Sequence, residues 1–295
     1  MTGTIWLIGN KGMLGAELSL LLEKNGIPFT GTGREVDITD AAAVNAFAGK
    51  MAFSGPGWIV NCAAYTAVDK AEDDAEACRR LNAAGPAIIA ACAKKNGLKF
   101  IHISTDYVFN GRLARPCRED DSADPLGVYG LTKRDGELAA LENNPCTYII
   151  RSAWLYGRYG KNFVTTMLRL MNEKDEVKVV NDQRGSPTWT HDLSLAILSF
   201  IRNDAPFGIY HFSGDGNISW FDLAGEIYLL GRQYGLIKKD CRVTACGSAE
   251  YAVRARRPAY SVLDKSKIIA SLGIDIPFWK DSLRKFLKET PNAHS

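Results

Sequence analysis

Short apolar runs alternate with longer stretches of helical periodicity over the first half of the chain. Leu14, Leu18, Leu21 and Leu22, for example, form one apolar stripe of a helix that follows the first run. The apolar runs are 4–8, 28–31, 58–61, 100–104 and 147–151. Continuous apolar strands separated by helices are typical of a parallel sheet covered on both faces. The pattern therefore predicts an α/β fold with a doubly wound parallel, Rossmann-type sheet.

The alternation loosens after Arg151, which predicts a division of the chain. We expect a dinucleotide-binding Rossmann domain over 1–150, with return segments after residue 165, and a smaller substrate-binding α/β lobe over 151–295. The segment 110–124 is rich in turn-forming and acidic residues and is expected to be a surface loop that can close over a substrate. Residues 289–295 are expected to form a frayed tail.

Composition excludes several classes of partner. The net charge is only +3, and lysine and arginine form no block, which argues against nucleic-acid or membrane-surface binding. No apolar run reaches the roughly 18 residues of a membrane span. The seven cysteines are scattered without zinc-site spacing, and His102 and His211 are expected to be core residues. Together these features predict a cytoplasmic protein with no metal constellation in its sequence.

A glycine-rich turn separates the first predicted strand from the first predicted helix. Strand, glycine turn and helix in this order are typical of a dinucleotide site, where the glycines allow close approach to a pyrophosphate at the helix N-terminus. The spacing is Gly-x-x-Gly-x-x-Gly. The residues predicted to contact the cofactor here are Gly9, Asn10, Lys11, Gly12, Met13, Leu14 and Gly15.

The end of the second strand bears on the choice between NADPH and NADH. An arginine at this position accommodates a 2′-phosphate, whereas a carboxylate binds the ribose hydroxyl. Arg34, with Lys11 nearby, favours NADPH, but a shift of one residue would place Glu35 as the carboxylate and leave NADH as the alternative. Asp37 and Ile38 follow where the adenine edge would lie.

The loop after the third strand is built of small residues that can pass beneath a diphosphate and ribose. Ala63, Ala64 and Tyr65 are therefore predicted to contact the cofactor. Asn82, on the next helix, is either a polar link within the core or part of an active-site water network.

A candidate proton donor follows the fourth strand. Tyr129 and Lys133 lie four residues apart, on one face of a helix, where an ammonium can lower the pKa of a phenol. Thr105 ends the strand and can hydrogen-bond the same reacting oxygen. Tyr234 and Lys238 have the same spacing but no comparable strand end before them, so Tyr129 is the stronger candidate.

Several residues of the second half have two interpretations each. Trp154 and Trp189 either stack on a base or sugar or fill the core. Arg184 and Arg257 either bind a sugar diphosphate or are ordinary surface or packing residues.

The glycine turn, the Ser104–Phe109 run and the Tyr129/Lys133 pair resemble the extended short-chain dehydrogenase/reductases. The stretches 61–72, 182–188 and 257–263 are similar to the branch of that family that acts on dTDP-4-dehydro-L-rhamnose. The resemblance extends from about residue 4 to about residue 285.

The resemblance implies reduction of the C4 ketone of dTDP-4-dehydro-L-rhamnose by a nicotinamide cofactor, in dTDP-rhamnose biosynthesis. Tyr129 would donate the proton, Lys133 would hold the nicotinamide ribose and depress the tyrosine pKa, and Thr105 would orient the carbonyl. Substrate contacts are implied for Val68, Thr105, Tyr107 and Trp154. The alternatives are a reductase or epimerase of another nucleotide sugar, and a non-catalytic NADP-binding regulatory subunit.

The resemblance also bears on assembly and metal binding. It implies a homodimer, and in some members a Mg²⁺ ion held by glutamates at the subunit interface. Glu17 is the one position here that matches such a ligand.

Overall fold

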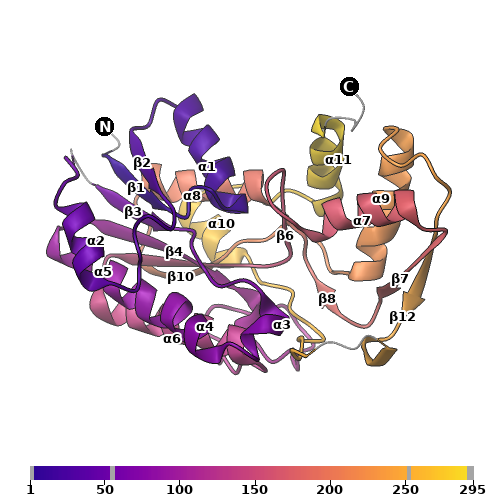
Figure 1. Cartoon of the computed structure of the whole chain (residues 1–295), viewed down its shortest axis with the longest axis horizontal. Coiled ribbons are helices and arrows are strands. Elements are labelled where there is room, and N and C mark those ends of the chain that lie inside the picture. The colour runs from indigo at the N-terminus through magenta and orange to yellow at the C-terminus, as the bar shows by residue number, and fades with distance from the viewer. Residues whose placement is uncertain (1–2, 54–56, 251–253, 291–295) are drawn as a thin grey trace.

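The computed structural model describes residues 3–53, 57–250 and 254–290 and contains a six-stranded central sheet. The strands follow the order β10-β5-β4-β3-β1-β2, and every neighbouring pair is parallel (Figure 1). Their bounds are β1 Ile5–Ile8, β2 Phe29–Thr32, β3 Trp58–Asn61, β4 Lys99–Thr105, β5 Thr147–Ser152 and β10 Gly208–His211. The predicted doubly wound α/β fold is confirmed, and β2 lies one residue later than the predicted 28–31.

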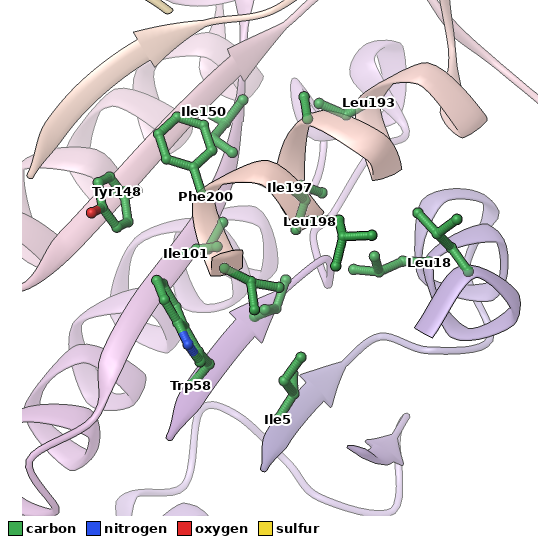
Figure 2. Packing of buried hydrophobic residues seen from close by; sticks show 14 of the residues in the cluster. Ile5, Leu18, Trp58, Ile101, Tyr148, Ile150, Leu193, Ile197, Leu198 and Phe200 are labelled. Carbon is green, nitrogen blue, oxygen red and sulfur yellow. The ribbon is translucent and has the colours of Figure 1, made fainter. Parts of the chain in front are cut away.

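One face of the sheet is covered by α1 (Met13–Lys24), α8 (Thr190–Arg202) and α10 (Ser266–Leu272). Because successive strand residues point to opposite faces, Ile5 and Leu7 of β1 contribute to this layer. Figure 2 shows Phe200 of α8 beside Tyr148 and Ile150 of β5. The helix α8 comes from the second half of the chain, so this half returns to complete the layer that β1 began.

The opposite face is covered by α2 (Ala41–Ala48), α5 (Gly85–Lys95) and α6 (Val128–Asn143). Trp6 and Ile8 of β1 belong to this layer, as the alternation requires. Three short elements lie between β3 and α5, namely α3 Val68–Ala71, α4 Ala75–Arg79 and the π-helical η1 Arg80–Ala84. The 3₁₀ turn η2 Asp106–Val108 lies between β4 and α6. With both faces buried, the strands expose only their ends, and a site on this sheet has to lie there.

The rest of the second half forms a smaller lobe, seen on the right in Figure 1. Its helices and strands enclose a separate apolar cluster that includes Met171, Leu223 and Leu283. The elements are α7 Phe163–Glu173, α9 Trp220–Gln233, α11 Trp279–Glu289, the parallel pair β7 Glu176–Val180 and β12 Arg242–Cys246, the pair β6 Leu155–Tyr156 and β9 Thr188–Trp189, the pair β8 Arg184–Gly185 and β11 Ile218–Ser219, and η3 Ser248–Glu250. Among the described residues, no helix is both long and apolar enough to cross a membrane.

The strand order reverses between β1 and β3, because the chain adds β2 on one side of β1 and then β3, β4 and β5 on the other. In open parallel sheets the loops at such a point diverge and leave a crevice beyond the carboxyl ends of the strands. Here the loops after β1 and β3 approach closely. A Cβ added to Gly9 would lie 2.7 Å from the backbone nitrogen of Ala63.

A buried ion pair fastens α6 to β5. The Arg151 guanidinium donates to both carboxylate oxygens of Glu137, with the shortest contact at 2.7 Å, and the two side chains are 4% and 1% exposed. A bidentate geometry of this kind compensates much of the cost of burying two charges, but removing one partner leaves the other charge uncompensated.

The loop 110–124 is fastened at several points, in contrast to the expectation of a loop free to close. Cys117 bridges to the segment beside Leu263, accepting from the Asp264 N–H at 2.7 Å and donating to Val262. Within the loop, Arg115 pairs with Asp121 at 2.6 Å. The loop is therefore part of the connection between the two lobes.

Replacing Glu137 by Gln is expected to lower the free energy of unfolding by about 3–5 kcal/mol, because the Arg151 charge stays buried without its partner. The matched control is Glu173→Gln, which breaks an exposed pair between Arg169 and Glu173 and should cost less than about 0.5 kcal/mol. Urea denaturation followed by circular dichroism measures both. Equal losses for the two variants would contradict the role given to the buried pair.

Candidate active site

The glycine turn after β1 forms a cradle of backbone. Gly9 has φ 79°, a left-handed conformation that favours glycine, and its carbonyl accepts from the Gly12 N–H at 3.0 Å. A Cβ on Gly15 would lie 2.1 Å from the same carbonyl oxygen. Since neither position has room for a side chain, the turn brings the N-terminus of α1 directly to the crevice.

The residues of this turn fit the diphosphate of a dinucleotide. The N-terminus of α1 has no acidic residue in its first turn and no side-chain cap on Gly12, so its N–H groups are available to an anion. Asn10 adds a buried side-chain oxygen, Oδ1, that has no hydrogen-bond partner among the described residues, and as an acceptor it fits a hydroxyl group of the cofactor rather than the anionic diphosphate. A cradle closed to side chains, together with an unpartnered buried acceptor, is the environment expected of a cofactor site rather than of a structural turn alone.

Arg34 and Glu35, which follow β2, have different environments in the structure. The Glu35 carboxylate turns back to accept from the Gly33 N–H at 2.7 Å, and that bond holds the pKa of Glu35 below its usual value. Lys11 lies 4.0 Å from the same carboxylate. Arg34 is exposed and makes no hydrogen bond or ion pair within the described part of the chain. The Arg34 guanidinium therefore has no partner among the described residues, whereas the Glu35 carboxylate is already hydrogen-bonded.

Asp37 and Ile38 lie next along the chain. The Asp37 carboxylate accepts from the backbone N–H and the hydroxyl of Thr39, which lowers the pKa of Asp37. Ile38 is buried, and its side chain meets the start of α5 at Gly85. Local hydrogen bonds thus hold Asp37, and packing against α5 holds Ile38.

Two asparagines fix the loop 62–67 after β3. The Asn61 side chain accepts from the Ala63 N–H at 3.0 Å, and Asn82 both accepts from the Tyr65 N–H at 2.8 Å and donates to the Tyr65 carbonyl. Asn82 is 1% exposed, so of its two interpretations the polar core link is the one seen. The loop that includes Ala63, Ala64 and Tyr65 is held at both ends beside the glycine turn.

Thr105, Tyr107 and Tyr129 meet at the carboxyl end of β4. The Thr105 hydroxyl donates to Asp106 Oδ1 at 3.1 Å and accepts from the Tyr107 N–H at 3.2 Å, and the Tyr129 phenol lies beside it. The Tyr107 and Tyr129 rings pack edge to face with centroids 5.5 Å apart. Lys133 follows one helical turn later on α6. The structure thus brings Thr105 and Tyr129 together at one strand end, whereas the Lys133 side chain turns to other partners.

The pKa of Tyr129 differs from the sequence-based expectation. Burial of the phenol raises this pKa above its usual value, and the nearby Asp106 carboxylate adds to the shift. The expected lowering by Lys133 is absent here. Its Nζ instead donates to the Ile103 carbonyl at 2.6 Å and lies 3.1 Å from Nε2 of His102. Tyr129 is consequently a protonated phenol near neutral pH.

Asp106 is a residue of this site that the sequence interpretation did not single out. Its side chain is 2% exposed, and burial raises its pKa to about 6. Oδ1 binds Thr105, while Oδ2 has no hydrogen-bond partner among the described residues. An acidic residue directly after a strand-ending hydroxyl was the available signal, but nothing in the sequence indicated that the carboxylate would be buried.

Trp154 and Trp189 have different environments in the structure. Trp189 is 6% exposed within the apolar cluster of the second lobe, as the core interpretation required. Trp154 has φ 48°, uncommon for a residue with a side chain, and stacks on Trp220 with centroids 3.5 Å apart. Gly185 lies against its ring as well. Trp154 is partly exposed, unlike Trp189.

Arg257 and Val68 lie where the two halves of the chain meet, whereas Arg184 lies within the second lobe. Arg257 donates to the Asp69 carboxylate at 2.9 Å, and its guanidinium lies near the Tyr107 phenol. Val68 is the first residue of α3, beside Asp69, and this part of the site is therefore closed by a contact between the two halves of the chain. Arg184 is engaged with the carbonyl and the side chain of Asn217.

The expectation of Mg²⁺ held by Glu17 finds no support. The Glu17 carboxylate lies 3.0 Å from Nδ1 of His191, and this hydrogen bond raises the pKa of the imidazole. No group of three side chains of the kinds that hold a metal occurs in residues 3–53, 57–250 and 254–290.

The matching Tyr234/Lys238 spacing does not form a second site. Tyr234 caps the C-terminus of α9, so Lys238 lies beyond the helix and the two do not share a helical face. The spacing has chemical meaning only where a helix continues through it, as α6 does.

The family model of the RmlD substrate binding domain matches residues 3–292. The chain belongs to this family.

Several relatives of this RmlD-family chain are named as enzymes that act on dTDP-linked sugars. A dTDP-4-dehydrorhamnose reductase of Streptomyces griseus is 44% identical, over 94% of this chain and 91% of the relative. A probable dTDP-4,6-dihydroxy-2-methyloxan-3-one 4-ketoreductase of Streptomyces antibioticus is 41% identical over 95% and 93%. The crystal structure of a dTDP-4-dehydrorhamnose reductase of Bacillus anthracis in complex with NADP has a TM-score of 0.90 and 34% identity, covering 98% of this chain and all of the other.

Gly15→Ala is expected to lower the free energy of unfolding by about 1–3 kcal/mol, because the new methyl group would collide with the Gly9 carbonyl. Gly225→Ala is the matched control, since it also lies within a helix but faces open space, and there alanine should stabilise by up to roughly 1 kcal/mol. Thermal denaturation of both variants tests the difference. Similar behaviour of the two would show that the turn has room to relax.

Proposed function

We propose that this chain reduces the C4 ketone of dTDP-4-dehydro-L-rhamnose to dTDP-L-rhamnose, with NADPH as the hydride donor. The observation that carries the proposal is the meeting of Thr105, Tyr107 and Tyr129 at the carboxyl end of β4, in the same sheet whose first strand ends in the glycine cradle. The substrate is taken from the reductases to which the chain is similar over nearly its whole length.

The nicotinamide, when bound, supplies the hydride. Gly9–Gly15 and the loop 63–65 hold the dinucleotide, and Arg34 and Lys11 receive the 2′-phosphate. The unengaged guanidinium of Arg34 supports this assignment, as does the Glu35 carboxylate, which is already bound to the Gly33 N–H. NADH is the second choice, because it forgoes the contact with Arg34.

Tyr129 is the proton donor in this proposal. Reduction of a ketone creates an alkoxide, which requires a donor in its protonated form. The environment that raises the pKa of Tyr129 keeps the phenol protonated at neutral pH, and this suits the reductive direction. Thr105, oriented by Asp106 and by the Tyr107 N–H, places its hydroxyl beside the same oxygen.

The sugar nucleotide would lie between the lobes. Val68 and Tyr107 would flank the sugar ring, and the partly exposed edge of Trp154 would contact the nucleotide portion. The Asp69–Arg257 contact next to Tyr107 closes this region from the other side. A reductase of a different dTDP-linked 4-keto sugar is the second candidate, because the Streptomyces antibioticus relative is nearly as similar as the rhamnose enzyme.

Replacement of Tyr129 by Phe should reduce turnover of dTDP-4-dehydro-L-rhamnose by about 10²–10⁴-fold, since the proton donor is lost, and leave NADPH affinity unchanged. NADPH oxidation measured by absorbance, with substrate supplied by the upstream enzymes, tests both points. Turnover equal to wild type would remove Tyr129 from the mechanism. NADPH binding by wild type without oxidation on this substrate, but with oxidation on another dTDP-4-keto sugar, would establish the second candidate.

Arg34→Ala should raise the KM for NADPH by about tenfold to a hundredfold and barely change that for NADH, because a charge-assisted contact to the 2′-phosphate is lost. Glu35→Gln is the companion variant and should leave the KM for NADPH near its wild-type value. Steady-state kinetics with each cofactor decide the matter. An equal rise for both cofactors in Arg34→Ala would assign 2′-phosphate recognition elsewhere.

A further inference from the structure

A buried chain of three side chains ends at Lys133. Asn61 closes β3, His102 lies opposite it in register on β4, and Lys133 reaches them from α6. None of the three is more than 1% exposed. Asn61 Nδ2 lies 3.1 Å from His102 Nδ1, and His102 Nε2 lies 3.1 Å from Lys133 Nζ.

The direction of these hydrogen bonds is fixed from the Asn61 end. Asn61 Oδ1 accepts from the Ala63 N–H at 3.0 Å, and a backbone N–H can only donate. The amide nitrogen therefore faces His102, and because an amide nitrogen donates, His102 Nδ1 must accept. A neutral imidazole that accepts at Nδ1 carries its proton on Nε2.

That proton points at Lys133. An ammonium group has no lone pair and cannot accept it, whereas a neutral amine can accept from Nε2–H and still donate to the Ile103 carbonyl. If Lys133 is charged, one donor in the chain must face another donor. The network therefore favours the uncharged amine.

The other titratable groups around Lys133 give the ammonium little compensation. Cys62 comes from the loop after β3 and Cys78 from α4, and burial raises the pKa of both thiols, that of Cys62 to about 12, so neither is an anion. Glu137, one turn along α6, favours the ammonium, but its carboxylate is already in the ion pair with Arg151. Burial lowers the pKa of Lys133 to about 8 despite Glu137.

We propose that His102, oriented by Asn61, is a positioning residue that holds Lys133 as an uncharged amine in the cofactor-free protein above about pH 8, and that NADPH binding at such a pH draws a proton from solvent onto Lys133 Nζ. The inference rests on the proposed function and on the contact with the nicotinamide ribose that the family resemblance implies for Lys133. There the ribose hydroxyls and the cofactor phosphates replace His102 as partners and favour the ammonium. The step converts amine and proton to ammonium, with no other bond formed or broken.

Proton uptake can be measured by titrating NADPH into the full-length protein in an isothermal calorimeter at about pH 8.5, in Tris and in EPPS buffers. At this pH the 2′-phosphate, with a pKa of about 6, is fully ionised and takes up no proton itself. The dependence of the binding heat on the ionisation enthalpy of the buffer gives the protons bound. We expect an uptake of roughly half to one proton per cofactor, and a dissociation constant that rises by up to about tenfold per pH unit above pH 8.

Asn61→Asp is the discriminating variant. An isosteric carboxylate still accepts from the Ala63 N–H, but its second oxygen now accepts from His102 Nδ1–H, which leaves Nε2 as an acceptor for an ammonium. Proton uptake should then fall close to zero. His102→Gln, which can turn a carbonyl oxygen toward Lys133, should do the same and serves if the Asp variant does not fold. His191→Gln is the control and should take up as many protons as wild type.

The outcomes separate the two proposals. NADPH binding by wild type with equal heats in both buffers would overturn the inference and leave the proposed function intact. Uptake in Asn61→Asp or His102→Gln equal to that of wild type would also overturn it, since the network would not be the cause. Failure of wild type to bind NADPH would overturn the proposed function and the inference together.

Discussion

The hydrogen bond from the Ala63 N–H to the Asn61 side chain is the constraint on which the site depends. It holds the loop after β3 against the glycine turn after β1, where a side chain on Gly9 would collide with Ala63. The same bond fixes which end of the Asn61 amide faces His102. One interaction thus shapes the crevice and determines the direction of the hydrogen bonds that reach Lys133.

Polar and apolar contacts both join the first half of the chain to the second. Arg257 binds Asp69, and the loop 110–124 is paired through Cys117 with the segment beside Leu263, within a small buried apolar cluster. Polar contacts of this kind position residues with less stabilisation than an apolar interface of equal size gives, because exposed charges keep most of their interaction with water. The second lobe is accordingly placed with precision over the strand ends while each lobe retains its own core.

Much of the fold could be predicted because its causes are local. Apolar strands, a glycine turn and an amphipathic helix appear as patterns within short stretches, and these gave the parallel sheet and the position of the cradle. The Tyr129/Lys133 spacing also predicted a shared helical face correctly. The partners of Lys133 could not be predicted, since His102 and Asn61 reach it only through strand pairing, and Trp154 gave no sign of its left-handed backbone or its stacking on Trp220. The prediction of a lowered pKa for Tyr129 was wrong for the same reason, because desolvation depends on every residue packed around the phenol.

Burial shifts the pKa values of Tyr129 and Lys133 in opposite directions, but in both cases it favours the uncharged form. A low-dielectric environment disfavours the charged form of each group, so it raises the pKa of the phenol and lowers that of the ammonium. Both groups are thereby driven toward neutrality while the crevice holds no anion. A reduction that consumes one proton per turnover benefits from this arrangement, since the phenol is already in its donating form. A lysine that gains its charge only with the cofactor would then exert its pull on the phenol at the stage where a phenolate has to form.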